Sequence, residues 1–462
     1  MRRGAVATLL AAGLLAAETA AQEAGPPGTY AFTHVDVLSM ASPDLHPDRT
    51  VVVRDGIIVA VGPAAGVEVP QGARVIDGRG RILMPGLAEM HAHVPPRPDP
   101  DMDQVREILF LYIANGITTI RGMLGQTYQI QLARDLEAGR ILGPTFYVGA
   151  PSINGNSAPD PETAERLVRR HKAQGYDLQK IHPGVSLATW DRMAAVAREL
   201  DFPFGGHVPA DVGLVHALES GMSSVDHLDG YVQAIAGDDV VAQINTGRPI
   251  SLGGLARGAD DEKLQEVIHL TLRHNAYVVP TLYLWENLYG TTDPEPFLNL
   301  PEMRYVSEAQ KEAWRRQASR GPRGTPEELE AFFTLRKRIL KELSDAGAGI
   351  LMGTDSPQMF NVPGFALHRE IRLMEEAGMS RYAILRSGTV NVARYVAEHL
   401  HRRGNFGTVE EGNRADLVLL DANPLEDLDN LTARVGVMVR GRWIPREGID
   451  RRLARIAAKY GG

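Results

Sequence analysis

Six polar side chains of the kinds that bind metal ions stand at the ends of short apolar segments, and this placement constrains the fold more than any other feature. In chain order they are His91, His93, Lys180, His207, His227 and Asp355. Because side chains alternate along a strand, His91 and His93 lie on one face and can reach the same ion. A fold that gathers all six must bring the ends of distant segments together.

The middle of the chain predicts an α/β fold, a (β/α)8 TIM-like barrel. Strand-like apolar runs alternate there with helical patterns, and eight such runs are the number that closes a parallel barrel. The predicted strands are residues 82–93, 117–123, 145–153, 177–183, 202–208, 223–228, 277–284 and 349–355. The six candidates fall at or near the carboxyl ends of the first, fourth, fifth, sixth and eighth strands, the end at which such barrels carry their active sites.

Both chain ends are rich in β-type residues, which predicts a small β-sandwich domain built from residues 22–85 and 401–462. Asp55-Gly56 joins two β-rich runs and is a strong hairpin signal. The barrel then takes residues 86–400, and a C-terminal helix follows the last strands. A length of 462 residues suits a large barrel with a small companion domain.

A long excursion at residues 285–347 separates the last two predicted strands. Ser307 and Thr325 each stand three residues before a Gln or Glu, which is a helix-start signal. Apolar residues then follow Thr325 at helical spacing, so the second helix is expected to pack on the core. The excursion could overhang the barrel mouth and shape the substrate pocket.

The first residues predict a cleavable signal peptide at residues 1–21, with cleavage near Ala21/Gln22. A basic start is followed by an apolar run at residues 5–17 and then by small residues. That run is shorter than the roughly 20 residues needed to span a bilayer. We therefore expect a periplasmic or secreted protein with no membrane attachment after signal removal.

Charge and cysteine content narrow the partners further. The net charge is −8, no basic run suggests nucleic acid, and the absence of cysteine excludes disulfides. The expected partner is a small-molecule amide or dipeptide substrate, and a homo-oligomer remains open.

Imidazoles and carboxylates suit zinc, so we expect two divalent ions, assigned as zinc. A pair of ions can hold a hydroxide between them as the nucleophile, and Asp355 is placed to shuttle the proton to the leaving amine. A protonated Lys180 would repel cations. Burial favours its neutral amine, which can add carbon dioxide and bridge two ions as an N6-carboxylated lysine.

At these residues the chain resembles the amidohydrolase superfamily, most closely the imidazolonepropionase-related group that includes Xaa-Pro dipeptidases and N-acyl amino acid hydrolases. The matching segments are residues 84–93, 116–119 with Arg121, 179–181, 206–207, 226–227, 353–355 and 407–418. The resemblance implies a first metal held by His91, His93, Lys180 and Asp355. It implies a second metal held by Lys180, His207 and His227.

The expected function is metal-dependent hydrolysis of a C–N bond, with Xaa-Pro dipeptides or N-acyl amino acids as favoured substrates. Asp355 and Lys180 are the expected catalytic residues. Tyr231 could hydrogen-bond the substrate carbonyl or the developing oxyanion, or pack as a loop aromatic. The candidate substrate-binding residues are Arg121, His182, Tyr231 and His368. An arginine fork would hold a substrate carboxylate at two points.

Two alternatives stand beside this function. The same site could hydrolyse a lactone or phosphoester or deaminate a ring, although deaminases of this fold typically lack the bridging lysine. The protein could instead be a catalytically silent binding protein, but the six candidate ligands are all intact.

Overall fold

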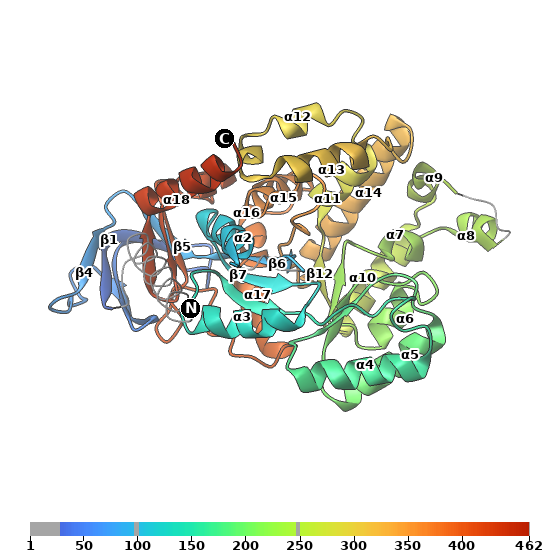
Figure 1. The fold of residues 1–462 in the computed structure, drawn as a ribbon, viewed down its shortest axis with the longest axis horizontal. Coiled ribbons are helices and arrows are strands. Elements are labelled where there is room, and N and C mark those ends of the chain that lie inside the picture. The colour runs from blue at the N-terminus through green and yellow to red at the C-terminus, as the bar shows by residue number, and fades with distance from the viewer. Residues whose placement is uncertain (1–27, 97–100, 246–249, 462) are drawn as a thin grey trace, which may run out of the picture.

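The structure is a computed structural model that describes residues 28–96, 101–245 and 250–461. Figure 1 shows a sheet at the left that combines blue and red strands from the two chain ends, with the barrel and its helices to the right of it. The predicted signal peptide at residues 1–21 lies outside the described residues. Within the described ranges, every helix is too short or too polar to cross a membrane.

Parallel strands form the barrel wall, as the sequence predicted. They are β6 (Leu87–Ala92), β7 (Ile117–Gly122), β8 (Thr145–Val148), β9 (Gln179–Ile181), β10 (Phe204–Gly206), β11 (Ser224–Asp226) and β12 (Tyr277–Val279). They make two sheets, β6-β7-β8 and β9-β10-β11-β12. The parallel bridge Gly149↔Leu178 links β8 to β9. Residues 349–356 bridge to both β12 and β6, so this irregular segment takes the place of the predicted eighth strand.

The predicted strands were longer than the observed ones, and for two of them the structure shows the reason. The segment 82–93 is two strands, because β5 (Ile82–Pro85) belongs to the sheet of the chain ends and β6 to the barrel. The chain changes sheets at Gly86, where an added Cβ would come within 2.4 Å of the Thr118 side chain. The segment 277–284 ends as a strand at Val279, because Pro280 has no N–H to donate and Thr281 adopts a left-handed φ of 45°.

Helices cover the outside of the barrel (Figure 1). Those that follow the strands are α2 (Asp103–Ala114), α3 (Thr127–Glu137), α4 (Pro161–Gln174), α5 (Leu187–Glu199), α6 (Leu214–Glu219), α10 (Asp261–Arg273), α15 (Phe365–Glu376), α16 (Arg381–Ser387) and α17 (Val390–Glu398). Short helices also lie between β11 and α10, namely α7 (Tyr231–Ala234), α8 (Asp238–Asn245) and α9 (Leu252–Arg257).

The excursion before the eighth segment is helical, and its predicted starts are confirmed. It contains α11 (Leu282–Gly290), α12 (Glu295–Leu298), the 3-10 helix η1 (Pro301–Tyr305), α13 (Glu308–Ala318) and α14 (Pro326–Asp345). Ser307 caps α13, and Thr325 caps α14 in a capping box with Glu328. The apolar stripe of α14 is buried, as its spacing predicted.

The two chain ends share one sheet. Its remaining strands are β1 (Tyr30–Leu38), β2 (Leu45–Arg54), β3 (Ile57–Pro63), β4 (Arg74–Asp77), β13 (Leu417–Leu420), β14 (Arg434–Val439) and β15 (Arg442–Pro445). Within the described residues the order is β15-β14-β13-β5-β1-β2-β3, with β4 beside β1. Phe32 and Val51 share a core with Leu417 and Met438, so the sheet folds onto itself as the predicted sandwich. The 3-10 helix η2 (Leu428–Thr432) and α18 (Arg446–Lys459) complete the C-terminal part.

Candidate active site

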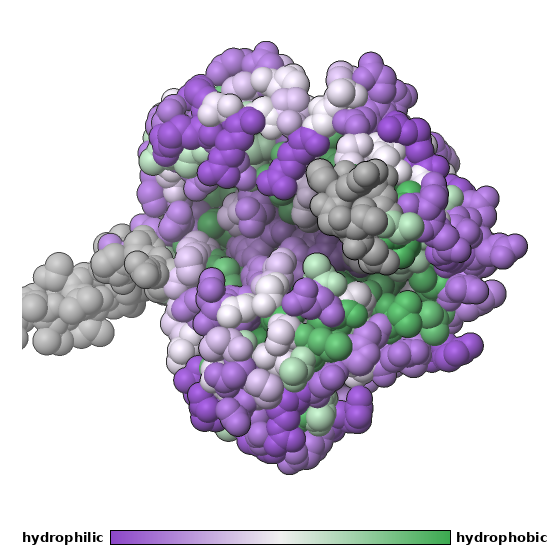
Figure 2. All heavy atoms as spheres, turned by 90° about the vertical axis from the view of Figure 1, so that its right-hand side faces the viewer, coloured by the Kyte–Doolittle hydropathy of each residue, from purple (hydrophilic) through white to green (hydrophobic). Residues whose placement is uncertain are grey.

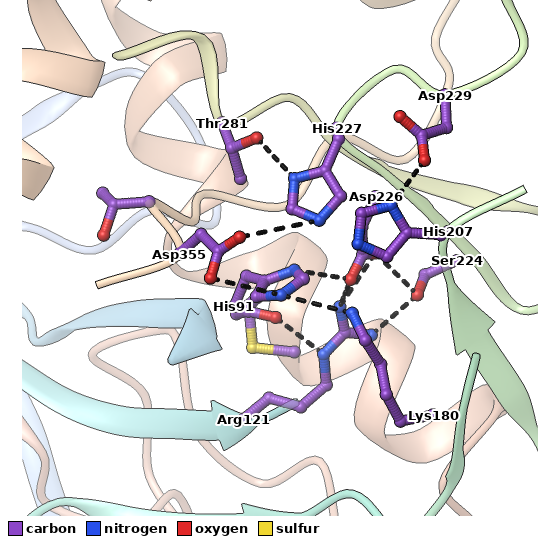
Figure 3. Close-up of polar contacts among 12 residues, drawn as sticks. His91, Arg121, Lys180, His207, Ser224, Asp226, His227, Asp229, Thr281 and Asp355 are labelled. Atoms are coloured by element: carbon purple, nitrogen blue, oxygen red, sulfur yellow. Dashed lines mark hydrogen bonds and ion pairs between the residues drawn. The ribbon is translucent and has the colours of Figure 1, made fainter. Parts of the chain in front are cut away.

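The structure brings the predicted ligand side chains together at the carboxyl ends of the barrel strands, and Figure 3 shows His91, Lys180, His207, His227 and Asp355 there. Asp355 lies at the centre. Its Oδ1 is 2.6 Å from Nε2 of His93 and 3.7 Å from Nε2 of His91, and its Oδ2 is 3.7 Å from Nε2 of His227. Nζ of Lys180 lies 3.3 Å from Nε2 of His91.

His207 joins the cluster through His227, and the centroids of these two rings are 4.4 Å apart. His91 lies on the other side of His227, at a centroid distance of 4.5 Å. His207 and His227 directly follow β10 and β11, whose parallel pairing places them side by side.

Three of the histidines are oriented through Nδ1. The contacts are His91 to Asp226 Oδ2 at 2.7 Å, His207 to Asp229 Oδ2 at 2.6 Å, and His227 to the Thr281 hydroxyl at 2.8 Å. A partner on Nδ1 fixes the ring and leaves the Nε2 lone pair for a metal, as is usual for histidine ligands. Nε2 of His227 is buried and has no hydrogen-bond partner among the described residues.

Burial sets the charge of these groups. It lowers the pKa of His91 and of His227 well below the usual value, so both imidazoles are neutral. It also lowers the pKa of Lys180, which favours the free amine. Burial opposes ionisation of Asp355, but the neighbouring His91 and His93 outweigh it and lower the pKa of that carboxyl.

The donor set therefore fits divalent metal ions. Neutral imidazole nitrogens and a carboxylate are zinc-type ligands, and atoms of His91, His227 and Asp355 all lie within 4.8 Å of one another. His227, Thr281 and Asp355 have left-handed φ values of 67°, 45° and 62°. Non-glycine residues in that region are strained, and such strain gathers at functional sites.

Of the predicted substrate-binding residues, His182 lies beside the site. Its ring stacks on His207 at a centroid distance of 5.1 Å. Burial and the nearby Lys180 lower the pKa of His182 to about 3, so its imidazole is neutral and can exchange hydrogen bonds with a ligand.

The prediction that Arg121 binds a substrate carboxylate was wrong. The side chain is fully buried, and its guanidinium is occupied by protein groups (Figure 3). Nη2 donates to both carboxylate oxygens of Asp226, at 3.1 and 3.2 Å, and Nε donates to the Met90 carbonyl at 2.7 Å. Nη1 donates to the hydroxyls of Ser224 and Tyr395. Arg121 thus positions Asp226, which in turn orients His91.

Tyr231 and His368 were also wrongly predicted. The Tyr231 side chain is buried, and its hydroxyl is 2.7 Å from that of Thr271 on α10. Nε2 of His368 lies 3.2 Å from the Asn115 amide oxygen and 3.4 Å from Arg434 on β14. His368 therefore packs where the barrel meets the sheet of the chain ends.

Glu89 is a site residue that the sequence analysis missed. Its buried carboxylate accepts from the His91 N–H at 3.0 Å and from the N–H and hydroxyl of Thr354 at 2.8 and 2.6 Å. Burial raises the pKa of Glu89 to about 8. Strand alternation could have identified Glu89 from the sequence, because residue 89 lies on the same face of the strand as His91 and His93.

The face at the right of Figure 1, where α7 and α9 lie, is hollowed near its centre, and hydrophilic residues line the depth of the hollow (Figure 2). Helix α7 begins four residues after His227, so this is the side of the barrel that carries the site.

Comparison with known proteins agrees with this geometry. Residues 82–444 match the model of the Amidohydrolase family. The chain is 24% identical to an adenine deaminase of Oleidesulfovibrio alaskensis over 401 residues, which cover 84% of this chain and 54% of that protein. It is 29% identical to a dihydroorotase of an Anaeromyxobacter species over 167 residues, 34% of this chain and 37% of that one. The chain spans about half or less of the length of these curated relatives.

Solved structures show the same fold. A bottromycin amidohydrolase has a TM-score of 0.71 at 23% identity, and the match covers 95% of this chain and 92% of that one. A Xaa-Pro dipeptidase with bound methionine has a TM-score of 0.63 at 18% identity, covering 90% of this chain and all of that one.

Proposed function

This chain belongs to the amidohydrolase family, and from that premise we propose that it hydrolyses an amide C–N bond in a small substrate, with Xaa-Pro dipeptides or N-acyl amino acids as the substrate class. One observation carries the proposal. Neutral imidazoles of His91 and His227, the Asp355 carboxylate and the buried amine of Lys180 converge on one point at the barrel mouth.

The residues divide into two ligand groups. His91, His93 and Asp355 would hold one divalent ion, and His207 with His227 would hold a second. When bound, such ions acidify water and polarise a carbonyl. Lys180 would serve both groups as a carbamate. Its neutral Nζ would form a bond to the carbon of carbon dioxide and release one proton, which leaves a carbamate whose single negative charge is shared by two oxygens.

Asp355 supplies the proton transfer. Its carboxylate is held ionised beside His93 at 2.6 Å, so it can accept a proton from the attacking water and pass it to the departing amine nitrogen. His182, neutral and stacked on His207, offers a hydrogen bond to the substrate beside this carboxylate.

A metal analysis joined to a hydrolysis screen tests the proposal. We expect about two divalent ions per chain, hydrolysis of some dipeptides or N-acyl amino acids, and loss of activity on chelation. Lys180→Ala should lose metal and activity and recover part of both with short carboxylic acids. One ion per chain together with a fully active Lys180→Ala would reject the carbamate.

Cyclic C–N substrates are the second candidate. The curated relatives named adenine deaminase and dihydroorotase favour it, although they match only part of their own length. Ammonia release from adenine and ring opening of dihydroorotate belong in the same screen, with lactones and phosphoesters. Faster turnover of any of these than of every linear amide would replace the first candidate.

We also propose that the protein acts outside the cytoplasm, on the strength of the basic, apolar and small-residue order of residues 1–21. N-terminal sequencing of the exported protein should begin at or near Gln22. A mature protein that keeps Met1 and remains in the cytoplasm would contradict this.

A further inference from the structure

A buried arginine that has no ion pair with any described residue lies close to the site. Arg336, on α14, has only 4% of its surface exposed. Its guanidinium carbon is 5.6 Å from the ring centroids of both Trp285 and Phe332. Its Nη2 donates a long hydrogen bond, 3.4 Å, to the Pro280 carbonyl. Its Nε has no hydrogen-bond partner among the described residues.

The carboxylates that raise the pKa of Arg336 from a distance are in direct contact with other groups. Asp229 contacts His207 at 2.6 Å, and Glu286 pairs with Lys337 at 3.2 Å. Glu370 accepts two backbone N–H groups. In the part of the chain that the structure describes, no carboxylate lies within 4.0 Å of the Arg336 guanidinium. A buried charge without a counter-ion lowers the stability of the folded protein unless a group of opposite charge binds to it.

The ring of Trp285 connects Arg336 to His227, a predicted metal ligand. The centroids of the Trp285 and His227 rings are 5.9 Å apart. Pro280, which Nη2 reaches, directly precedes Thr281, whose hydroxyl orients His227. Helices α11 and α14, which carry Trp285 and Arg336, pack against each other (Figure 1).

Trp285 has an unsatisfied donor of its own. Its Nε1 atom is buried and has no hydrogen-bond partner within the described ranges. Two buried N–H donors without acceptors, one of them on a cation, therefore belong to neighbouring side chains next to His227. Other buried arginine Nε atoms also have no partner among the described residues, but these two donors are neighbours beside a predicted metal ligand, and that position points to a ligand that supplies the acceptors.

We propose that Arg336 and Trp285 bind the free carboxylate of the amide substrate and so make this enzyme selective for amides of amino acids. The inference rests on the proposed amide hydrolysis. A guanidinium matches a carboxylate at two points, and the indole N–H can add a third donor. In a dipeptide the carboxylate carbon is about 4 Å from the scissile carbonyl carbon, so an anion site must lie close to the metal ligands. Arg336 takes the role that the sequence had assigned to Arg121.

A set of matched variants tests this assignment. Arg336→Met removes the charge, Arg336→Lys restores a point charge, and Trp285→Phe keeps the ring but removes the N–H. Arg338→Met is the control, since Arg338 is an exposed residue of the same helix that pairs with Asp261 and Glu342.

The measurement is kcat/KM for pairs of substrates that differ only in a free or amidated carboxyl group. In Arg336→Met we expect the preference for the free acid to fall on the order of 10- to 100-fold, with turnover of the amide retained. Arg336→Lys should recover part of it, Trp285→Phe should lose a smaller part, and Arg338→Met should match wild type. Equal loss for acid and amide would indicate a structural role and overturn the proposal.

Calorimetric titration of the metal-loaded enzyme with N-acetyl-L-alanine and with its amide separates this inference from the proposed function. Binding of the acid alone, lost in Arg336→Met, supports the anion site even if no amide is hydrolysed. Amide hydrolysis in which acid preference is absent or independent of Arg336 keeps the function and rejects the site. Trp285→Phe serves as a second test if Arg336→Met does not fold.

Discussion

Asp355 contacts three imidazoles through its two oxygens, and its carboxylate can both bind a metal ion and accept a proton from an attacking water. Asp355→Asn should therefore lower kcat/KM by about 10²- to 10⁴-fold, because the amide cannot accept the proton. Metal content should fall less than in His91→Ala, which loses a ligand outright. Steady-state kinetics with metal analysis of both variants checks this. Activity of Asp355→Asn within about threefold of wild type would assign proton transfer to another group.

Arg121 donates a hydrogen bond to Asp226, and Asp226 contacts His91. Substitution of Arg121 should therefore change stability and metal binding rather than substrate preference. Arg121→Met leaves a buried carboxylate uncompensated, which typically costs about 3–5 kcal/mol. We expect a lower thermal midpoint and weaker metal retention, with an unchanged ratio of kcat/KM for acid and amide substrates. A changed ratio in a fully stable variant would restore Arg121 as a substrate ligand.

The errors at single residues have a physical cause. Strand ends predicted which histidines cluster with Lys180 and Asp355, since position on a barrel strand fixes which end a side chain occupies. The contacts of Arg121 depend on Asp226 and Tyr395, which are distant in sequence, and no local pattern encodes them. Arg336 was not singled out from the sequence, because its place beside the site depends on how α14 packs.

At the scale of elements, Glu370 of α15 caps the helix that carries Trp285. Its carboxylate accepts from the N–H groups of Leu282 and Tyr283, each at 2.8 Å, at the start of α11, where Thr281 provides no side-chain cap. Burial raises the pKa of Glu370 from 4.5 to about 7. Between those values the folded protein keeps a proton that the unfolded chain has released. The stability contributed by this proton is complete below about pH 4.5 and is lost as the pH rises through about 7.

Glu370→Gln should remove this pH dependence. From about pH 5 to about pH 8, the free energy of unfolding of wild type should fall relative to that of the variant by about 2 kcal/mol. Urea titrations of both proteins, each stripped of metal, measure the difference. Glu375→Gln on the same helix is the control and should follow wild type. A difference that is constant with pH, or that grows with pH, would contradict the assignment.

Element boundaries were predicted best where the signal was local. The capping residues Ser307 and Thr325 gave the starts of α13 and α14, because each cap is a contact between neighbours in sequence. The change of sheet at Gly86 could not be read from its apolar surroundings. The Gly86 N–H donates to the Asp416 carbonyl, and the Leu87 N–H donates to the Gly116 carbonyl. Partners that are far apart in the chain therefore decide where β5 ends and β6 begins.

At the scale of the whole molecule, the barrel depends on the sheet that both chain ends complete. Strand β13 pairs with β5 from Leu417↔Pro85 to Leu420↔Ile82, one residue before the chain enters the barrel. The sequence predicted this arrangement because β-rich segments flank the long α/β middle at both ends of the chain.

Deletion of residues 401–462 should therefore prevent soluble folding, although the predicted ligands all remain. It would leave β5 as an open edge and expose the apolar core that Phe32 shares with Leu417 and Met438. Unpaired edges and large apolar patches promote aggregation. Deletion of residues 446–462 is the control. It removes α18 but keeps every strand, so that chain should stay soluble with a lower thermal midpoint. Solubility, circular dichroism and metal content decide the matter, and a soluble, metal-loaded chain ending at residue 400 would show that the barrel folds alone.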